Sequence, residues 1–282
     1  MLSVEKAEER IDSASRNAVR IADVYFDLAD HGSVLEKIRM NRNSQTARFI
    51  TLVNPHSVML SRRDAEMRRA VRKAWINLPD GVGIIVGARM LSCPQLDRTS
   101  GPELMLYLCQ NGRQHGLRHY FYGGGAGVAE KLAARLSASF PGLVVAGTHA
   151  PPYRSYGADE DQDTIDRINA ARPDILWVGL GAPKQESWMA RHAGRLDGSV
   201  MIGVGAAFDF HSGNKPWCPA LLRRGGLEWA YRLCCEPRRL WRRNLDSLRF
   251  LSLVASQRAA ARNGLGGDGE PDANAARNRM GD

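Results

Sequence analysis

The chain has 282 residues, of which 44 % are hydrophobic and 24 % charged, and it carries a formal net charge of +9. This length allows one large domain or two small ones, and the basic balance indicates an anionic partner: nucleic acid, an acidic membrane or a phosphate-rich ligand. The five cysteines, an odd number without a Cys-x-x-Cys pair, argue against a disulfide framework or a zinc site, and no apolar run approaches the roughly 18 residues that span a bilayer.

Strands and helices are predicted to alternate after a polar lead-in with helical character at residues 1–18, which lacks the apolar core of a signal peptide. The predicted strands are 48–55, 75–81, 118–125, 143–152, 174–183 and 199–210, and the predicted helices are 62–74, 81–92, 101–116, 127–142, 159–173 and 185–196. Such alternation predicts an α/β domain at 19–213, with a parallel sheet covered by helices on both faces.

A basic helical appendage is predicted at 214–258, where two helical stretches are broken at Pro237. Residues 223–249 hold eight arginines and three acidic residues, which is a net charge of +5. A solvated helix face is one interpretation, a membrane-surface element is another, and a nucleic-acid-binding surface would use the same charge. The remaining tail, 259–282, is rich in Gly, Asn, Asp and Ala and is expected to be disordered.

Polar or glycine-rich residues follow five of the predicted strands. The carboxyl ends of parallel strands meet at one edge of a sheet, where open α/β sheets bind their ligands. An ordinary solvated loop is the alternative at each strand end. The residues concerned are Thr51 and Asn54, Asp80, the glycines Gly123, Gly124 and Gly125, Lys184 and Gln185, and Asp209.

The glycine string "YGGGAG" (122–127) opens a predicted helix, where backbone N–H groups favour phosphate. It lacks the last glycine of G-x-G-x-x-G and the Lys-Ser/Thr of a P-loop, so a tight turn is an equal alternative. A nucleotide-dependent oxidoreductase would use the same alternating pattern and glycine loop. The incomplete fingerprint argues against it.

Asp80 lies between Pro79 and Gly81, where an aspartate commonly stabilises a turn through its local backbone. Alternatively, it is a general base at a strand end, positioned to take a proton from a hydroxyl. The seven histidines have no metal-ligand spacing, so no metal site is expected.

Taken together, the chain from about 48 to 251 resembles the WecG/TagA/CpsF glycosyltransferases (glycosyltransferase family 26). The stretches that carry the resemblance are "LPDGVGIIVGARML", "RTSGPEL", "YFYGGGAGVAEKLA", "RINAARPDILWVGLGAPKQESWMARH", "IGVGAAFDFHSG" and "GLEWAYRLCCEPRRLWRRN". The resemblance implies a Rossmann-like core and an inverting transferase without cofactor or required metal. It would move a sugar from a UDP-sugar to a polyprenyl-diphosphate-linked sugar in surface polysaccharide or teichoic-acid assembly.

The resemblance also implies roles for particular residues. Asp80 is similar to the family's base, and the nucleotide-sugar pocket would be lined by Asn54, Arg98, Gln185 and Asp209, with Thr51, the glycine loop and Lys184 also in the substrate site. Arg232, Arg239 and Arg242 match basic residues of the family's appendage, which closes over the site and meets the acceptor diphosphate and the membrane. The partners of this protein would thus include the inner face of the cytoplasmic membrane and further copies of the chain, but no nucleic acid.

Two departures from the family pattern affect these expectations. Many members read Thr-x-Asn on the first strand, whereas here Thr51 and Asn54 are one residue further apart, and such a shift turns a strand side chain to the other face. The basic turn after "FDF" is here "NKPWCP". The appendage is expected to be separable, so that removal of 214–282 leaves a folded core with reduced transfer.

Overall fold

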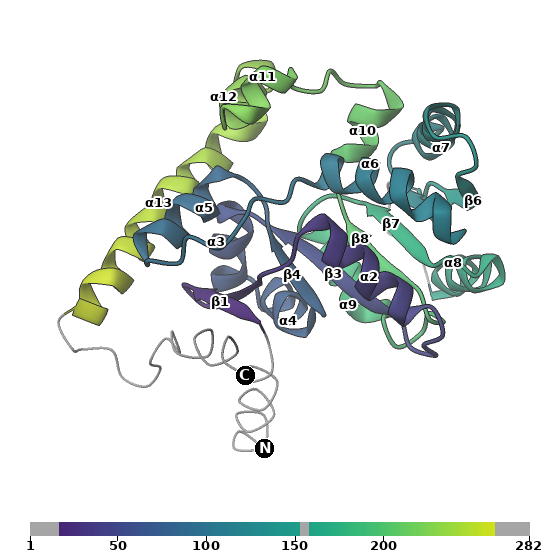
Figure 1. Cartoon of the computed structure of the whole chain (residues 1–282), viewed down its shortest axis with the longest axis horizontal. Helices are drawn as coiled ribbons and strands as arrows, with labels where there is room; N and C mark the ends of the chain where they lie inside the picture. Colours follow the sequence, from purple (N-terminus) through teal and green to yellow (C-terminus); the bar gives the residue numbers. More distant parts are fainter. Residues whose placement is uncertain (1–16, 153–157, 263–282) are drawn as a thin grey trace, which may run out of the picture.

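The computed structural model describes residues 17–152 and 158–262. Its centre is a sheet of six parallel strands in the order β4-β3-β8-β7-β5-β6 (Figure 1). The strands are β3 (Arg48–Val53), β4 (Ile76–Pro79), β5 (Arg118–Gly123), β6 (Val144–His149), β7 (Ile175–Gly179) and β8 (Val200–Gly203). Helices lie on both faces, so the predicted α/β fold is confirmed.

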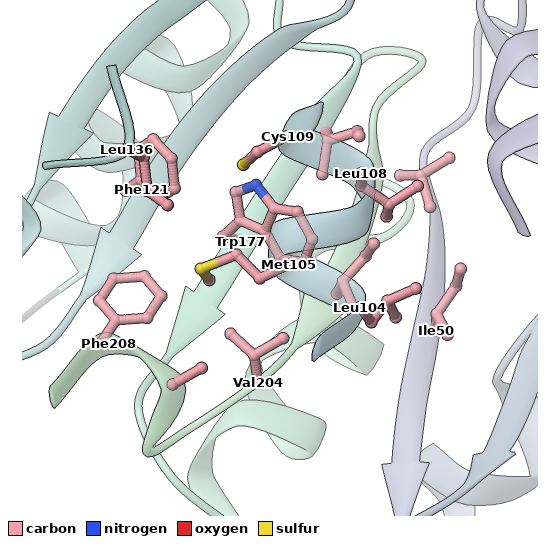
Figure 2. Close-up of a cluster of buried hydrophobic side chains, with 14 of the residues drawn as sticks. Ile50, Leu104, Met105, Leu108, Cys109, Phe121, Leu136, Trp177, Val204 and Phe208 are labelled. Atoms are coloured by element: carbon pink, nitrogen blue, oxygen red, sulfur yellow. The ribbon is translucent and has the colours of Figure 1, made fainter. Parts of the chain in front are cut away.

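Trp177 on β7 is the centre of the core on one face of the sheet, where it is fully buried (Figure 2). The helices on this face are α2 (His31–Asn41), α6 (Gly101–Gly112) with the short 3-10 turn η1 (Arg113–His115), α7 (Val128–Ser139) and α10 (Ala207–Ser212). The Trp177 indole N–H donates to Nδ1 of His119 at 3.0 Å, which satisfies the one polar atom that this side chain buries.

The opposite face of the sheet is covered by α8 (Ala158–Ala171) and α9 (Lys184–His192), with α4 (Ala65–Lys73) beside α9. The central strands are buried on both faces and are therefore apolar almost throughout, as in the sequence ILWVG of β7. Adjacent strands β3 and β8 lead into different layers, because β3 is followed by α3 (Pro55–Arg63) and β8 is followed by α10 on the face of Trp177.

A second hydrophobic cluster joins the two ends of the described chain. It is built by the antiparallel hairpin β1 (Ala18–Ile21) and β2 (Val24–Asp27) together with α3 (Pro55–Arg63), α5 (Val82–Met90) and α13 (Pro237–Arg262). Phe250 and Val254 of α13 are fully buried in it. The carboxyl-terminal half of α13 therefore belongs to the core, which argues against a separable appendage that begins at residue 214.

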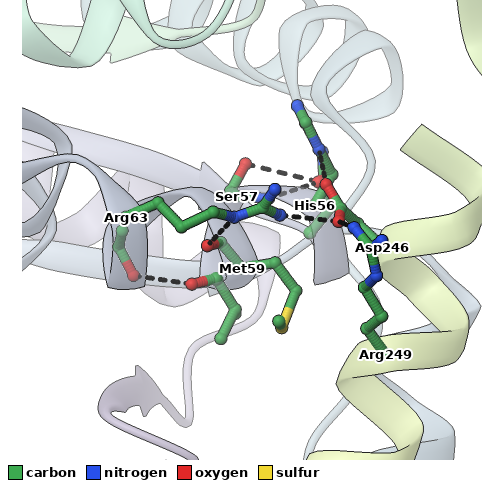
Figure 3. A network of polar contacts seen from close by, with 9 residues as sticks. His56, Ser57, Met59, Arg63, Asp246 and Arg249 are labelled. Carbon is green, nitrogen blue, oxygen red and sulfur yellow. Dashed lines mark hydrogen bonds and ion pairs between the residues drawn. The ribbon is translucent and has the colours of Figure 1, made fainter. Parts of the chain in front are cut away.

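A buried carboxylate, Asp246, fixes α13 to α3 (Figure 3). It lies 2.7 Å from Nδ1 of His56 and accepts hydrogen bonds from Arg63 at 2.6 Å and from Arg249 at 3.2 Å. These donors lower the pKa of Asp246, although burial alone would raise it. The carboxylate is thus fully paired, and α13 is held by both apolar and polar contacts.

Several element boundaries differ from the sequence-based predictions. The helix predicted at 62–74 is two helices, because Asp64 ends α3 and caps α4 by accepting from the N–H of Met67. The strand predicted at 199–210 ends at Gly203, and its second half forms α10. The lead-in at 1–18 lies mostly outside the described residues, while Ala18 begins β1; α13 continues to Arg262, beyond the predicted start of the tail.

Two short helices, α11 (Ala220–Arg224) and α12 (Glu228–Cys235), connect α10 to α13 at one end of the molecule (Figure 1). Within residues 17–152 and 158–262, no helix combines the length and the apolar character that crossing a bilayer requires.

Candidate active site

Asp80 follows β4 at the carboxyl edge of the sheet, and the backbone fixes its position from both sides. Its N–H donates to the carbonyl of Val53 at 2.9 Å, and the carbonyl of Pro79 accepts from Thr99 at 2.8 Å. Its partly buried carboxylate also accepts a hydrogen bond from Asn54. Asn54 in turn caps α3 by accepting from the N–H of Ser57 at 3.0 Å. The structure therefore brings the two strand-end residues Asn54 and Asp80 together.

The pKa of Asp80 is raised to about 6, first because burial disfavours the ionised form and second because Glu228 places another negative charge nearby. Arg232, the hydrogen bond from Asn54 and Arg98 act in the opposite direction. A carboxylate with a pKa near 6 is still ionised at neutral pH but holds a proton more strongly than an ordinary aspartate. These are the properties of a general base.

Arg98 lies between two carboxylates at the same edge of the sheet. Its guanidinium is 3.5 Å from Glu103 of α6 and 3.7 Å from Glu228 of α12, and its side chain is 19 % exposed. Glu103 also accepts a 2.8 Å hydrogen bond from Arg223. Ion pairs of Arg98 and Arg223 thus connect α6 of the core with the segment α11–α12 beside Asp80.

Two glycines of the loop after β5 are required by the close packing of its backbone, independently of any role in phosphate binding. Gly123 and Gly124 have φ values of 120° and 77°, which L side chains rarely adopt. A Cβ on Gly123 would lie 2.7 Å from the backbone of Gly179, and one on Gly124 would lie 2.9 Å from Val128. Gly125 is exposed and has no such constraint, so its backbone is the accessible part of the loop.

The turn after β7 brings three polar residues to the edge of the sheet, and their surroundings differ. Lys184 is exposed, whereas Gln185 and Glu186 are 5 % and 1 % exposed. The Gln185 carbonyl accepts from the N–H of Gly181 at 3.2 Å, and its amide donates to Glu186 at 2.9 Å. Gln185 is therefore held inside the turn, and its direct contact with a ligand would be limited to a small surface.

Asp209 lies on α10 rather than on a strand, and its carboxylate is 3.4 Å from Nζ of Lys215. Lys215 also donates to Glu236 at 2.8 Å, and Glu236 forms a close ion pair with Arg239. Asp209 thus belongs to a charged chain that connects α10 with the start of α13.

The three appendage arginines identified from the sequence have different surroundings. Arg232 faces Asp80, and its guanidinium lies 5.6 Å from the centre of the Phe210 ring. Arg239 is half exposed and paired with Glu236. Arg242 is exposed and stacks on Trp241 at 5.2 Å. Of the three, Arg232 is the one that faces the candidate base.

Thr51 is fully buried within β3, three residues before Asn54, and its hydroxyl donates to Asn77 of β4 at 2.5 Å. Asn77 in turn donates to the carbonyl of Tyr25 at 3.0 Å, so this polar pair connects the sheet with the hairpin. The structure thus gives Thr51 a structural contact, and its place in the substrate site stays a prediction.

Three charged residues at the site were missed by the sequence analysis: Glu186, Glu228 and Arg243. Burial raises the pKa of the Glu186 carboxyl, and its Oε2 has no hydrogen-bond partner among the described residues. Glu228 lies at the start of α12 and Arg243 on α13, about 150 residues from Asp80 along the chain. No local signal distinguished Arg243 from its seven neighbouring arginines.

A metal centre has no candidate within the part of the chain that the structure describes, where no three His, Cys, Asp or Glu side chains are grouped to hold an ion. The ionic groups around Asp80 are instead arginines and isolated carboxylates.

The arginines and carboxylates around Asp80 lie at the carboxyl edge of a parallel sheet, which is where open α/β sheets bind their ligands. The family model described as "Glycosyl transferase WecG/TagA/CpsF family" matches residues 19–264. The chain belongs to this glycosyltransferase family, as the resemblance in its sequence motifs indicated.

Two curated relatives share one name, N-acetylglucosaminyldiphosphoundecaprenol N-acetyl-beta-D-mannosaminyltransferase. The relative from Bacillus spizizenii is 30 % identical over 237 residues, which cover 84 % of this chain and 89 % of that protein. The relative from Staphylococcus aureus is 28 % identical over 237 residues, which cover 83 % and 90 %. The similarity therefore extends over the sheet and over the helices that follow it.

Proposed function

We propose that this protein transfers a hexosyl group from a UDP-sugar to a polyprenyl-diphosphate-linked sugar during surface polysaccharide synthesis. The observation that carries the proposal is Asp80, a carboxylate with a raised pKa at a strand end, surrounded by arginines. The names of the relatives specify an undecaprenyl-diphosphate-linked N-acetylglucosamine, so this acceptor is the first to test.

In the proposed reaction Asp80 accepts the proton of the acceptor hydroxyl. The hydroxyl oxygen forms a bond to the anomeric carbon on the side opposite the leaving group, while the bond from that carbon to the UDP oxygen breaks and its electrons leave with UDP. The configuration is therefore inverted. Asn54 supports the base, because its amide donates to the Asp80 carboxylate and keeps it in place.

The negative charge that develops on the leaving diphosphate requires cations or N–H dipoles. We assign this role to Arg98 and Arg232, which both face Asp80, and to the backbone of Gly125 in the loop before α7. With these groups in place we expect transfer without an added metal. Gln185 would orient the donor only indirectly, through the turn that it fixes.

An exposed apolar surface on α11–α13 supports action at a membrane. Trp241, Leu245 and Leu248 of α13 are 48 %, 41 % and 64 % exposed, and their spacing places them on one face of the helix. Trp229 and Leu221 are also exposed, at 55 % and 82 %. Aromatic and aliphatic side chains beside arginines are typical of helices that lie in the interface of an anionic bilayer. We propose that the protein binds the inner face of the cytoplasmic membrane in this way.

The test is transfer by Asp80→Asn with a UDP-sugar and the undecaprenyl-diphosphate-linked acceptor. We expect kcat to fall by about 10²- to 10⁴-fold, because general-base catalysis typically contributes this much, while UDP affinity stays within several-fold. Asp97→Asn is the matched control, since Asp97 is an exposed aspartate on the same loop as Arg98. Full activity of Asp80→Asn would show that another group is the base.

A further inference from the structure

Trp217, in the segment between α10 and α11, brings these two helices together. Its indole lies 5.0 Å from the His211 ring of α10 at an angle of 80°, and His211 donates from Nε2 to the carbonyl of Pro102 on α6 at 2.9 Å. The guanidinium of Arg223 on α11 lies over the indole, 3.6 Å from the ring centre. Among the described residues this is the shortest distance between a cation and an aromatic ring, so the contact is a close stack.

Arg223 is held between this stack and a carboxylate of α6. Its guanidinium donates to Oε1 of Glu103 at 2.8 Å, and its side chain is 15 % exposed. The Nε of Arg223 and the Nε1 of Trp217 are both buried and have no hydrogen-bond partner among the described residues. A contact between a cation and an aromatic face is strongest where little water reaches the cation, as it is here. The position of this guanidinium therefore depends on the indole ring.

The second oxygen of Glu103 faces Arg98. Oε2 lies 3.5 Å from the Arg98 guanidinium, and Glu228 on the other side lies 3.7 Å from it. Both distances are longer than those of a strong charge-assisted hydrogen bond, so Arg98 is held by charge from two sides. Because Arg223 fixes one oxygen of Glu103, it also fixes the other, which is one of the two charges that place Arg98.

We propose that Trp217 is a positioning residue of the active site: its ring fixes Arg223, and thereby the ion pair that places Arg98. The proposal rests on the proposed function, in which Arg98 stabilises the leaving diphosphate. Without the ring, Arg223 is no longer held against Glu103. This carboxylate then draws the Arg98 guanidinium toward itself and away from Asp80. The packing of α11 against α6 is in this way connected with the charge at the base.

The acidic limb of the pH profile of transfer reports the place of Arg98, because Arg98 lowers the pKa of Asp80. In Trp217→Leu this limb should move toward higher pH by about 0.5–1 unit, and kcat should fall about 10- to 100-fold. A purely structural loss would lower the amount of folded enzyme and leave the limb in place. The charged groups that face Asp80 are Glu228 and Arg232 of α12, Arg98 before α6, and Arg243 of α13.

Three further variants identify the path of the effect. Trp217→Phe keeps an aromatic face for Arg223 and should restore the limb of the wild type. Arg223→Met breaks the same connection and should reproduce the shift, and its combination with Trp217→Leu should add nothing. Trp75→Leu is the matched control, because Trp75 is also half-buried with an arginine, Arg48, 4.9 Å from its ring centre, but precedes β4 at the amino end. Its limb should not move.

Amide hydrogen exchange at residues 98–104 tests the same connection without an activity measurement. Trp217→Leu should speed exchange there, whereas Trp217→Phe and Trp75→Leu should not. A wild-type limb and kcat in Trp217→Leu, or unchanged exchange at 98–104, would overturn this inference and leave the proposed function intact. A wild-type chain that transfers no sugar would overturn the proposed function, and the exchange result would then decide the role of Trp217 by itself.

Discussion

Phe250→Ala tests whether the end of α13 belongs to the core. The ring of Phe250 is fully buried, and its Cε1 and Cζ atoms lie 3.0 Å from the place where a Cβ on Gly87 would be. The ring thus fills the space that a glycine on α5 leaves open, and Val254 packs beside it. Truncation of a buried phenylalanine to alanine costs about 3–5 kcal/mol, a large part of the stability of an ordinary domain.

The assay is urea unfolding followed by far-UV circular dichroism, together with amide hydrogen exchange on α3, α5 and α13. We expect Phe250→Ala to lower the free energy of unfolding by about 3 kcal/mol or more and to speed exchange in all three helices. Leu248→Ala is the control on the same helix, because Leu248 is 64 % exposed and its loss should change stability by less than about 0.5 kcal/mol. If the two variants are equally stable, or if exchange rises in α13 alone, α13 is not part of the core.

Two further predictions concern the catalytic base and the glycine loop. A base must be deprotonated to act, so kcat/KM should fall about tenfold per pH unit below pH about 6, the pKa of Asp80. Glu228→Gln removes a neighbouring negative charge and should therefore move this acidic limb of the pH profile to lower pH. An acidic limb that does not move in Glu228→Gln contradicts the assignment of Asp80 as the base. Gly123→Ala should destabilise the protein markedly, because its Cβ would lie 2.7 Å from the backbone of Gly179, whereas Gly125→Ala should unfold at the same urea concentration as the wild type. Equal midpoints would mean that the loop adapts.

The sequence predicted the sheet because fully buried strands are continuous apolar runs that end at polar or glycine residues. Asp80 and Asn54 were predicted as site residues for the same reason, since each directly follows such a run. Periodicity did not predict the element boundary where one apolar run contains both a strand and a helix. The stretch 199–210 begins as β8, but its part from Ala207 onward packs into the core as α10, and alternation alone does not distinguish these cases.

Long-range contacts explain what the sequence did not predict at the site. Glu228 and Arg243 reach Asp80 only because α12 and α13 return to the sheet edge, and the position of those helices depends on Phe250, Val254 and Asp246. In a segment with eight arginines, composition predicted a basic surface but not which guanidinium lies near Asp80. The position of each arginine is set by how α13 packs against α3, which the sequence pattern does not show.

One helix therefore connects the stability of the protein with the chemistry of its site. The part of α13 from Asp246 to Arg262 contributes apolar burial and the paired carboxylate Asp246, while the part before it brings Arg239 and Arg243 toward Arg232 and Asp80. Repulsion among these cations favours detachment of the earlier part of α13, whereas packing of the later part opposes it. An anion at the arginines would reduce the repulsion. It follows that a diphosphate ligand and the packing of Phe250 stabilise the same arrangement, so weakening that packing should also weaken diphosphate binding.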